Sequence, residues 1–160
     1  MSLFTPAAPE VRRSPDESAP WWRLLGWSFL LGGVVDLAFG VGILAAQERL
    51  APVFGITLPT PRVYVDLCGL LLVGLGLIYF LVFANPRRYA PVAVVATLLR
   101  FAGMALFTVG LYSGRAEPFF ANIARTDAGF ALVHAFLLHK AAGSLVNALV
   151  RPYAADRAER

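Results

Sequence analysis

Cysteine is nearly absent from this 160-residue chain, which contains only Cys68. A disulfide or a thiolate metal cluster needs a second cysteine, so neither forms within one copy of the chain. Charged residues are also scarce: Asp, Glu, Lys and Arg make up 15% of the sequence against 58% hydrophobic residues, and the mean hydropathy is +0.66. This balance excludes a soluble domain.

Catalytic and cofactor motifs are missing as well. The glycines of residues 69–76 and 40–42 follow no strand pattern, so they read as helix-packing glycines and not as a nucleotide-binding loop. The net charge of +4 comes from basic residues that lie beside the ends of apolar runs. That distribution is typical of membrane topology signals, and it excludes a nucleic-acid partner.

Long apolar runs are what the chain does have. Runs of more than the ~20 residues that a helix needs to cross a bilayer cover residues 22–46, 63–84, 89–112 and 127–150. They predict an all-α fold, a bundle of four transmembrane helices running up, down, up and down within residues 21–151. The first run is longer than the ~7–15 residues of a secretory-signal core, so we interpret it as a retained helix.

The ends of the chain and the basic residues predict an orientation. Residues 1–20 are rich in proline and predict a disordered leader that a partner protein holds, and residues 152–160 predict a polar tail. A cytoplasmic N-terminus places more basic residues inside than outside, which favours both termini in the cytoplasm. Those inside are Arg12, Arg13, Arg23, Arg87, Arg88, Lys140, Arg151, Arg157 and Arg160, and those outside are Arg49, Arg62, Arg115 and Arg125.

Each apolar run carries ionisable residues, and a charge within hydrocarbon needs a partner. At a rise of ~1.5 Å per residue, Asp36 and Arg100 share the middle of the membrane. Helical periodicity turns both toward faces of small residues, where another helix approaches. We therefore expect Arg100 to bond Asp36, with Asp66 as a second partner, and Asp127 and His134 to extend this polar cluster outward. A static clamp and a proton path both remain open.

The two histidines invite a cofactor interpretation, because imidazole is a frequent ligand of haem iron and also binds chlorophyll magnesium. His134 and His139 are rotated by about 140° from each other on a helix, so they cannot hold one metal ion together. Single ligation by either one remains open beside the plainer roles of a core imidazole and an interfacial residue. Asp127 has a plainer role too, as a cap at the start of the fourth helix.

The stretch Val35-Asp36-Leu37 followed by Gly40, together with apolar spans and short proline-bearing connections, resembles small bacterial four-helix membrane proteins of the DoxX-like type. The resemblance covers residues 22–150. It implies a multi-pass protein of the bacterial inner membrane, related to small subunits of quinone-linked oxidoreductases. It assigns no functional residue.

These observations predict a non-catalytic accessory or scaffolding subunit of a larger membrane complex, respiratory or photosynthetic. Glycine and alanine faces would pack laterally against partner subunits, and the remaining surface would contact the lipid bilayer. One alternative is a protein that handles a quinone or small solute, with Asp36, Arg100 and His134 lining a site open to the outer face. Another is a pigment-binding or haem-binding subunit that uses His134 or His139.

Overall fold

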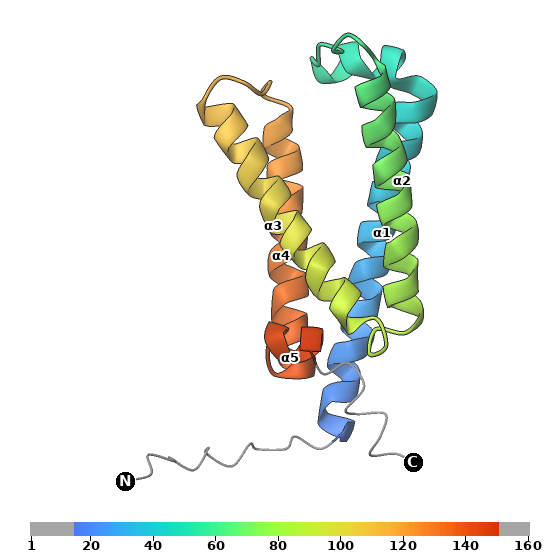
Figure 1. Ribbon diagram of the computed structural model, residues 1–160, viewed down its shortest axis with the longest axis vertical. Helices are drawn as coiled ribbons and strands as arrows, with labels where there is room; N and C mark the ends of the chain where they lie inside the picture. The colour runs from blue at the N-terminus through green and yellow to red at the C-terminus, as the bar shows by residue number, and fades with distance from the viewer. Residues whose placement is uncertain (1–14, 151–160) are drawn as a thin grey trace.

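A computed structural model describes residues 15–150, and this part of the chain forms helices without any strand (Figure 1). The helices are α1 (Pro15–Phe54), α2 (Val63–Ala84), α3 (Ala90–Tyr112), α4 (Phe120–Ala142) and α5 (Leu145–Val150). The predicted all-α class is confirmed for the described residues. The leader before residue 15 and the tail after residue 150 lie outside them.

Proline and glycine set the helix ends. Pro61 lies just before α2, and Pro91 occupies the first turn of α3, where its missing N–H leaves no hydrogen bond unmade. Gly114 follows α3 with a φ of 68°, and Gly143 ends α4 with a φ of 81° while its N–H bonds the carbonyl of His139. These left-handed conformations favour glycine and stop each helix where it occurs.

Within the part of the chain that the structure describes, three helical segments are long and apolar enough to cross a membrane: Glu17–Phe54, Val63–Ala84 and Ala90–Tyr112. α4 matches α3 in length but is not among them. Large apolar side chains are exposed along all of these helices, among them Leu31, Leu71 and Leu98, as expected of a surface that contacts lipid. The chain is therefore a multi-pass membrane protein.

The helix bounds correct two expectations. α2 and α3 lie where the apolar runs place them, but α1 continues beyond residues 22–46 at both ends. Residues 15–20, expected in the disordered leader, form its first turns, and its backbone leaves helical geometry at Ala46. The fourth helix covers residues 120–142 and not 127–150. Its first residues include polar side chains, so the apolar run begins later than the helix, and the left-handed conformation of Gly143 ends the helix before the apolar run ends.

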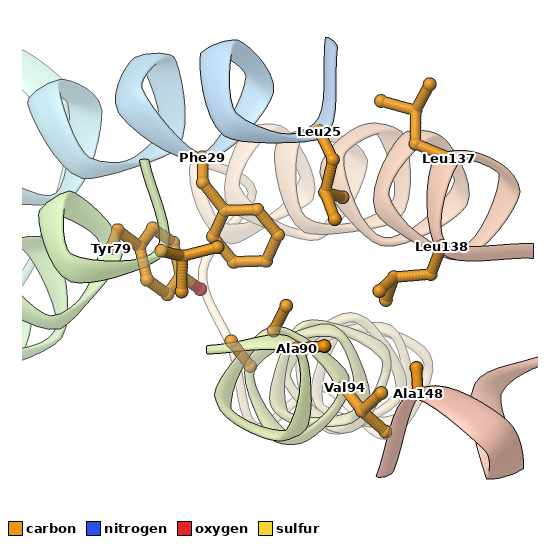
Figure 2. Packing of buried hydrophobic residues seen from close by; sticks show 11 residues of the cluster. Leu25, Phe29, Tyr79, Ala90, Val94, Leu137, Leu138 and Ala148 are labelled. Atoms are coloured by element: carbon orange, nitrogen blue, oxygen red, sulfur yellow. The ribbon is translucent and has the colours of Figure 1, made fainter. Parts of the chain in front are cut away.

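The long helices form two hairpins, α1 with α2 and α3 with α4, which diverge toward the end that carries the α1–α2 and α3–α4 loops (Figure 1). The hairpins join mainly through α1 and α4. At the other end a core of buried side chains from all five helices fills the space between them, including Phe29, Tyr79, Val94 and Leu138 (Figure 2).

Glycine pairs bring α1 and α2 into close contact. A Cβ built on Gly33 would lie 3.0 Å from the carbonyl oxygen of Gly76, and one on Gly40 would lie 2.7 Å from that of Gly69. The backbones approach so closely because neither helix has a side chain at these points. The small-residue faces expected to pack against other subunits are thus occupied within the chain.

Candidate functional site

Arg100, on α3, is the centre of a buried polar cluster to which four helices contribute. Its Nη2 donates to both carboxylate oxygens of Asp36 on α1, each at 2.7 Å, and its Nη1 donates to Oδ1 of Asp127 on α4 at 2.6 Å. Its Nε donates to the Tyr79 hydroxyl on α2 at 3.2 Å. The side chain is only 7% exposed, as is Asp127, and Asp36 is 3% exposed. The expected contact between Arg100 and Asp36 is present.

Aromatic rings enclose the guanidinium on the sides that the carboxylates leave free. The Arg100 Cζ lies 5.4 Å from the ring centre of Tyr79 and 5.2 Å from that of Phe130. Both distances are within the range in which a cation is attracted to an aromatic face. Because these rings are large and apolar, they also keep water and lipid away from the ion pairs, which strengthens each charge-assisted hydrogen bond.

Gly103 makes room for the Asp127 carboxylate. A Cβ on this residue, one turn after Arg100 on α3, would lie 2.6 Å from Asp127 Oδ2. The carboxylate therefore rests against the bare backbone of α3 while its other oxygen reaches the guanidinium. Asp127 itself lies inside α4, which begins at Phe120, so the expected role of Asp127 as a helix cap is wrong.

His134 lies beside this cluster without bonding to it. Its ring stacks on Phe29 at 3.9 Å between centroids, and it also contacts the rings of Tyr79 and Phe130. The residue has no exposed surface, and neither ring nitrogen has a hydrogen-bond partner in the described part of the chain, although the Ser28 backbone is near. His134 lies near Arg100 as predicted. It makes no hydrogen bond to Arg100 or Asp127, so these described residues do not form a continuous polar column.

Asp66 and His139 are not part of this cluster. Asp66 lies in the first turn of α2 and accepts a hydrogen bond from Gln47 Nε2 at 2.6 Å, so the expected pairing of Asp66 with Arg100 is wrong. The reason is depth, because Asp66 sits near the loop end of α2 while Arg100 lies midway along α3. His139 is an exposed residue in the last turn of α4.

A cavity of about 860 Å³ separates the two hairpins at their loop end. Its lining runs from Ala38 on α1 and Leu106 on α3 to the α1–α2 and α3–α4 loops. None of the five predicted cluster residues lines it. The expectation that Asp36, Arg100 and His134 line a site open to the outer face stays a prediction, and this cavity is not that site. The wall is rich in aromatic rings, from Phe39, Phe54, Tyr64, Phe107, Phe119 and Phe120.

Polar groups gather at the loop end of this cavity. Gln47, Tyr64 and Arg115 line it there, together with Thr57 and Glu117. The deeper wall, toward Ala38, is apolar. The cavity therefore has an apolar half directed along the helices and a polar mouth near the loops.

The α1–α2 and α3–α4 loops meet across the mouth. The rings of Phe54 and Phe119 lie 4.7 Å apart between centroids, and the Thr57 N–H donates to the Glu117 carboxylate at 2.8 Å. These contacts tie the end of the α1–α2 hairpin to the end of the α3–α4 hairpin. The cavity is thus bounded by helices on its sides and by the paired loops at its mouth.

Neither histidine offers a fitting place for a macrocycle. His134 is stacked on Phe29 and fully buried, so a haem or chlorophyll at its nitrogens would collide with the surrounding rings. His139 lies on the exposed surface, outside the cavity lining. In the described residues no group of His, Cys, Asp and Glu side chains is arranged to hold a metal ion.

Sequence reasoning missed Tyr79, Gly103 and the cavity. Tyr79 gives a detectable signal, since it is the one phenol in the interior of the second apolar run. The only sequence signal at Gly103 is its position three residues after Arg100, and a spacing of three is common on any helix. The cavity depends on the divergence of two hairpins and leaves no mark in the sequence.

Searches of protein-family models, curated proteins and solved structures found no match to this chain.

Proposed function

We propose that this protein binds a quinone-like amphiphile, a planar polar ring with one apolar chain, in the cavity between its two hairpins. The observation that carries the proposal is the cavity itself. Its volume of about 860 Å³ falls within the ~300–1,000 Å³ of small-molecule sites, and its wall combines apolar surface with a few polar groups.

The lining favours this ligand class over others. Aromatic side chains such as Phe54, Phe107 and Phe119 suit a planar ring, which gains from stacked and edge contacts. Tyr64 and Arg115 supply hydrogen-bond donors for ring carbonyl oxygens. A free inorganic anion or a sugar would leave most of the wall without complementary contacts. The ring belongs at the polar mouth, and the chain extends along the apolar half.

Cys68 provides the test, because it is the only cysteine and lines the cavity. Protein in lipid nanodiscs is treated with a fluorescent maleimide in the presence and absence of decylubiquinone. Occupancy of the cavity slows labelling of Cys68, by about tenfold at a quinone concentration ten times its Kd. The matched control is Leu70→Cys in a Cys68→Ser background, because Leu70 is an exposed residue of α2 outside the lining.

Protection of Cys68 with unchanged labelling of the Leu70 control supports binding in the cavity. Equal slowing at both sites means a general effect of quinone on the membrane, and no slowing at Cys68 means that the cavity does not take this ligand. Either result contradicts the proposal. A third arm with decanol separates recognition of the ring from recognition of the chain, since decanol alone should protect weakly.

The loop contacts predict how the ligand reaches the cavity. Phe54→Ala removes the ring contact with Phe119, so the mouth opens more often and Cys68 labelling accelerates. Val53→Ala is the control, because Val53 is the exposed neighbour outside the lining. Equal labelling rates in the two variants would contradict a gate at the loops.

The proposal includes a topology: α1 to α4 each cross the bacterial inner membrane, with both termini in the cytoplasm. Successive long helices run in opposite directions (Figure 1), and Arg87 and Arg88 lie in the short α2–α3 connection, where positive charge favours the cytoplasm. Reporter fusions test it. Alkaline phosphatase joined after Thr57 should be active, and a fluorescent protein joined after Arg88 should be bright; the reverse pattern contradicts this orientation.

The accessory-subunit function expected from the sequence stays a prediction with less support. Its main argument, the absence of catalytic motifs, is unchanged, but some of the glycines expected to pack against partner subunits, in the pairs Gly33 with Gly76 and Gly40 with Gly69, are used between α1 and α2. The DoxX-like relationship also stays a prediction.

A further inference from the structure

The polar cluster contains two carboxyl groups and only one guanidinium. From α1 it receives Asp36, from α2 Tyr79, from α3 Arg100, and from α4 Asp127 and His134. With both carboxylates ionised and the imidazole neutral, the formal charge is −1. Within residues 15–150, Arg100 is the only cationic side chain that pairs with either aspartate.

An uncompensated charge is poorly tolerated at this place. The two aspartates and the arginine are nearly fully buried between apolar helices. Moving an ion from water to such a medium costs several kcal/mol even after relaxation. Two compensations exist in principle, a metal cation and a proton. The described residues offer no group of ligands for a metal ion, which leaves the proton.

We infer that the Asp36–Arg100–Asp127 cluster is a proton-binding site whose two carboxyl groups share one proton. This inference is independent of what occupies the cavity. It follows from the number of charges, their burial and the arrangement of the hydrogen bonds.

Hydrogen-bond geometry distinguishes the two aspartates. Both oxygens of Asp36 accept from Arg100 Nη2, so each needs to remain an acceptor. Asp127 accepts only through Oδ1, and no described donor bonds its Oδ2, which rests against Gly103. A protonated carboxyl group keeps one acceptor oxygen and gains an O–H on the other. An O–H on Oδ2 of Asp127 would therefore leave the bond from Arg100 to Oδ1 in place.

His134 is the other group able to carry the proton, and its surroundings oppose it. An imidazolium has two N–H donors. Even with the nearby Ser28 backbone as acceptor for one of them, the other would be buried without an acceptor. The Phe29 ring stacked on it provides no acceptor in the plane of the imidazole. The pair of carboxyl groups remains the better proton carrier.

Infrared spectroscopy of the protein in nanodiscs at neutral pH tests this inference. A protonated carboxyl group gives a C=O band apart from those of carboxylates, and this band shifts in D₂O and on ¹³C labelling of the aspartate carboxyl carbons. We expect one such band. It should disappear in Asp127→Asn and remain in Asp66→Asn, since Asp66 lies outside the cluster.

Several results would overturn the inference. Absence of the band in the wild-type protein means that both aspartates are ionised, and a band that shifts on ¹³C labelling but persists in Asp127→Asn places the proton elsewhere. A band insensitive to aspartate labelling excludes both residues. The wild-type spectra decide the first and third outcomes, so the inference stays testable if a variant fails to fold. Quinone protection of Cys68 changes none of these readouts, so the two proposals fail separately.

Discussion

Replacing Arg100 tests the physical idea on which the site depends, that one guanidinium joins the two hairpins. Arg100→Gln removes hydrogen bonds to Asp36, Asp127 and Tyr79, which lie on three other helices. Removing one partner of a buried ion pair costs about 3–5 kcal/mol, because the remaining charge has lost its compensation. The bonds act as a unit, so we expect a loss in this range and not a sum over contacts.

The assay is reversible unfolding in mixed micelles at increasing SDS fraction, followed by tryptophan fluorescence. Asp66→Asn is the control, since it removes a carboxylate bonded by Gln47 and not by Arg100, and its loss should be near 1 kcal/mol. Arg100→Lys keeps the charge but replaces the planar fork with a single ammonium, so it should fall between wild type and Arg100→Gln.

A neutral cluster separates the cost of unpaired charge from the value of the contacts. When Arg100→Met is combined with Asp36→Asn and Asp127→Asn, no charge remains unpaired, and stability should recover toward wild type or beyond. If the free energy of unfolding of Arg100→Gln lies within about 0.5 kcal/mol of the wild-type value, as expected for a neutral surface substitution, Arg100 does not join the two hairpins as proposed. If the triple variant is no more stable than Arg100→Gln, the loss comes from packing and not from charge.

Two further predictions concern close contacts at glycine. Gly40→Ala should destabilise the protein by about 1–3 kcal/mol in the same unfolding assay, because the added Cβ meets the α2 backbone, whereas Gly74→Ala, with open space around it, should be neutral or stabilising. Equal effects would contradict close packing of α1 on α2. Gly103→Ala should displace the Asp127 carboxylate and weaken its bond to Arg100, and Asp127→Ala should remove most of that penalty. Gly129→Ala is its control, and additive losses in the double variant would contradict the contact.

The cluster and the cavity place different demands on the same bundle. The cluster requires Asp36 and Asp127 to be held at fixed distances from Arg100, and the glycine contacts of α1 with α2 and of Gly103 with Asp127 provide that rigidity. The cavity requires the hairpins to diverge beyond this point. Close packing of the helices at mid-length satisfies the requirements of both the cluster and the cavity. The helices then separate only toward the loop end, where Phe54 and Phe119 restrict the opening.

Sequence alone determined the helical class, the bounds of α2 and α3, and the pairing of Arg100 with Asp36. These follow from local properties: apolar length fixes where a helix crosses lipid, and rise per residue fixes the depth of each charge. The same reasoning contained the mistake about Asp66. Its depth near the loop end already differed from that of Arg100, and the nearer Gln47 satisfies it.

The tertiary structure decided the rest. α4 begins at Phe120, earlier than its apolar run. Asp127 therefore lies inside the helix at the level of Arg100, where it is the second carboxylate of the cluster. Contact between α1 and α4 then brings Phe29 against His134. Depth and periodicity describe each helix separately, whereas the order, tilt and divergence of helices depend on how all of them pack together. For this reason the direct bond of Asp127 to Arg100, the aromatic enclosure and the cavity between the hairpins appear only in three dimensions.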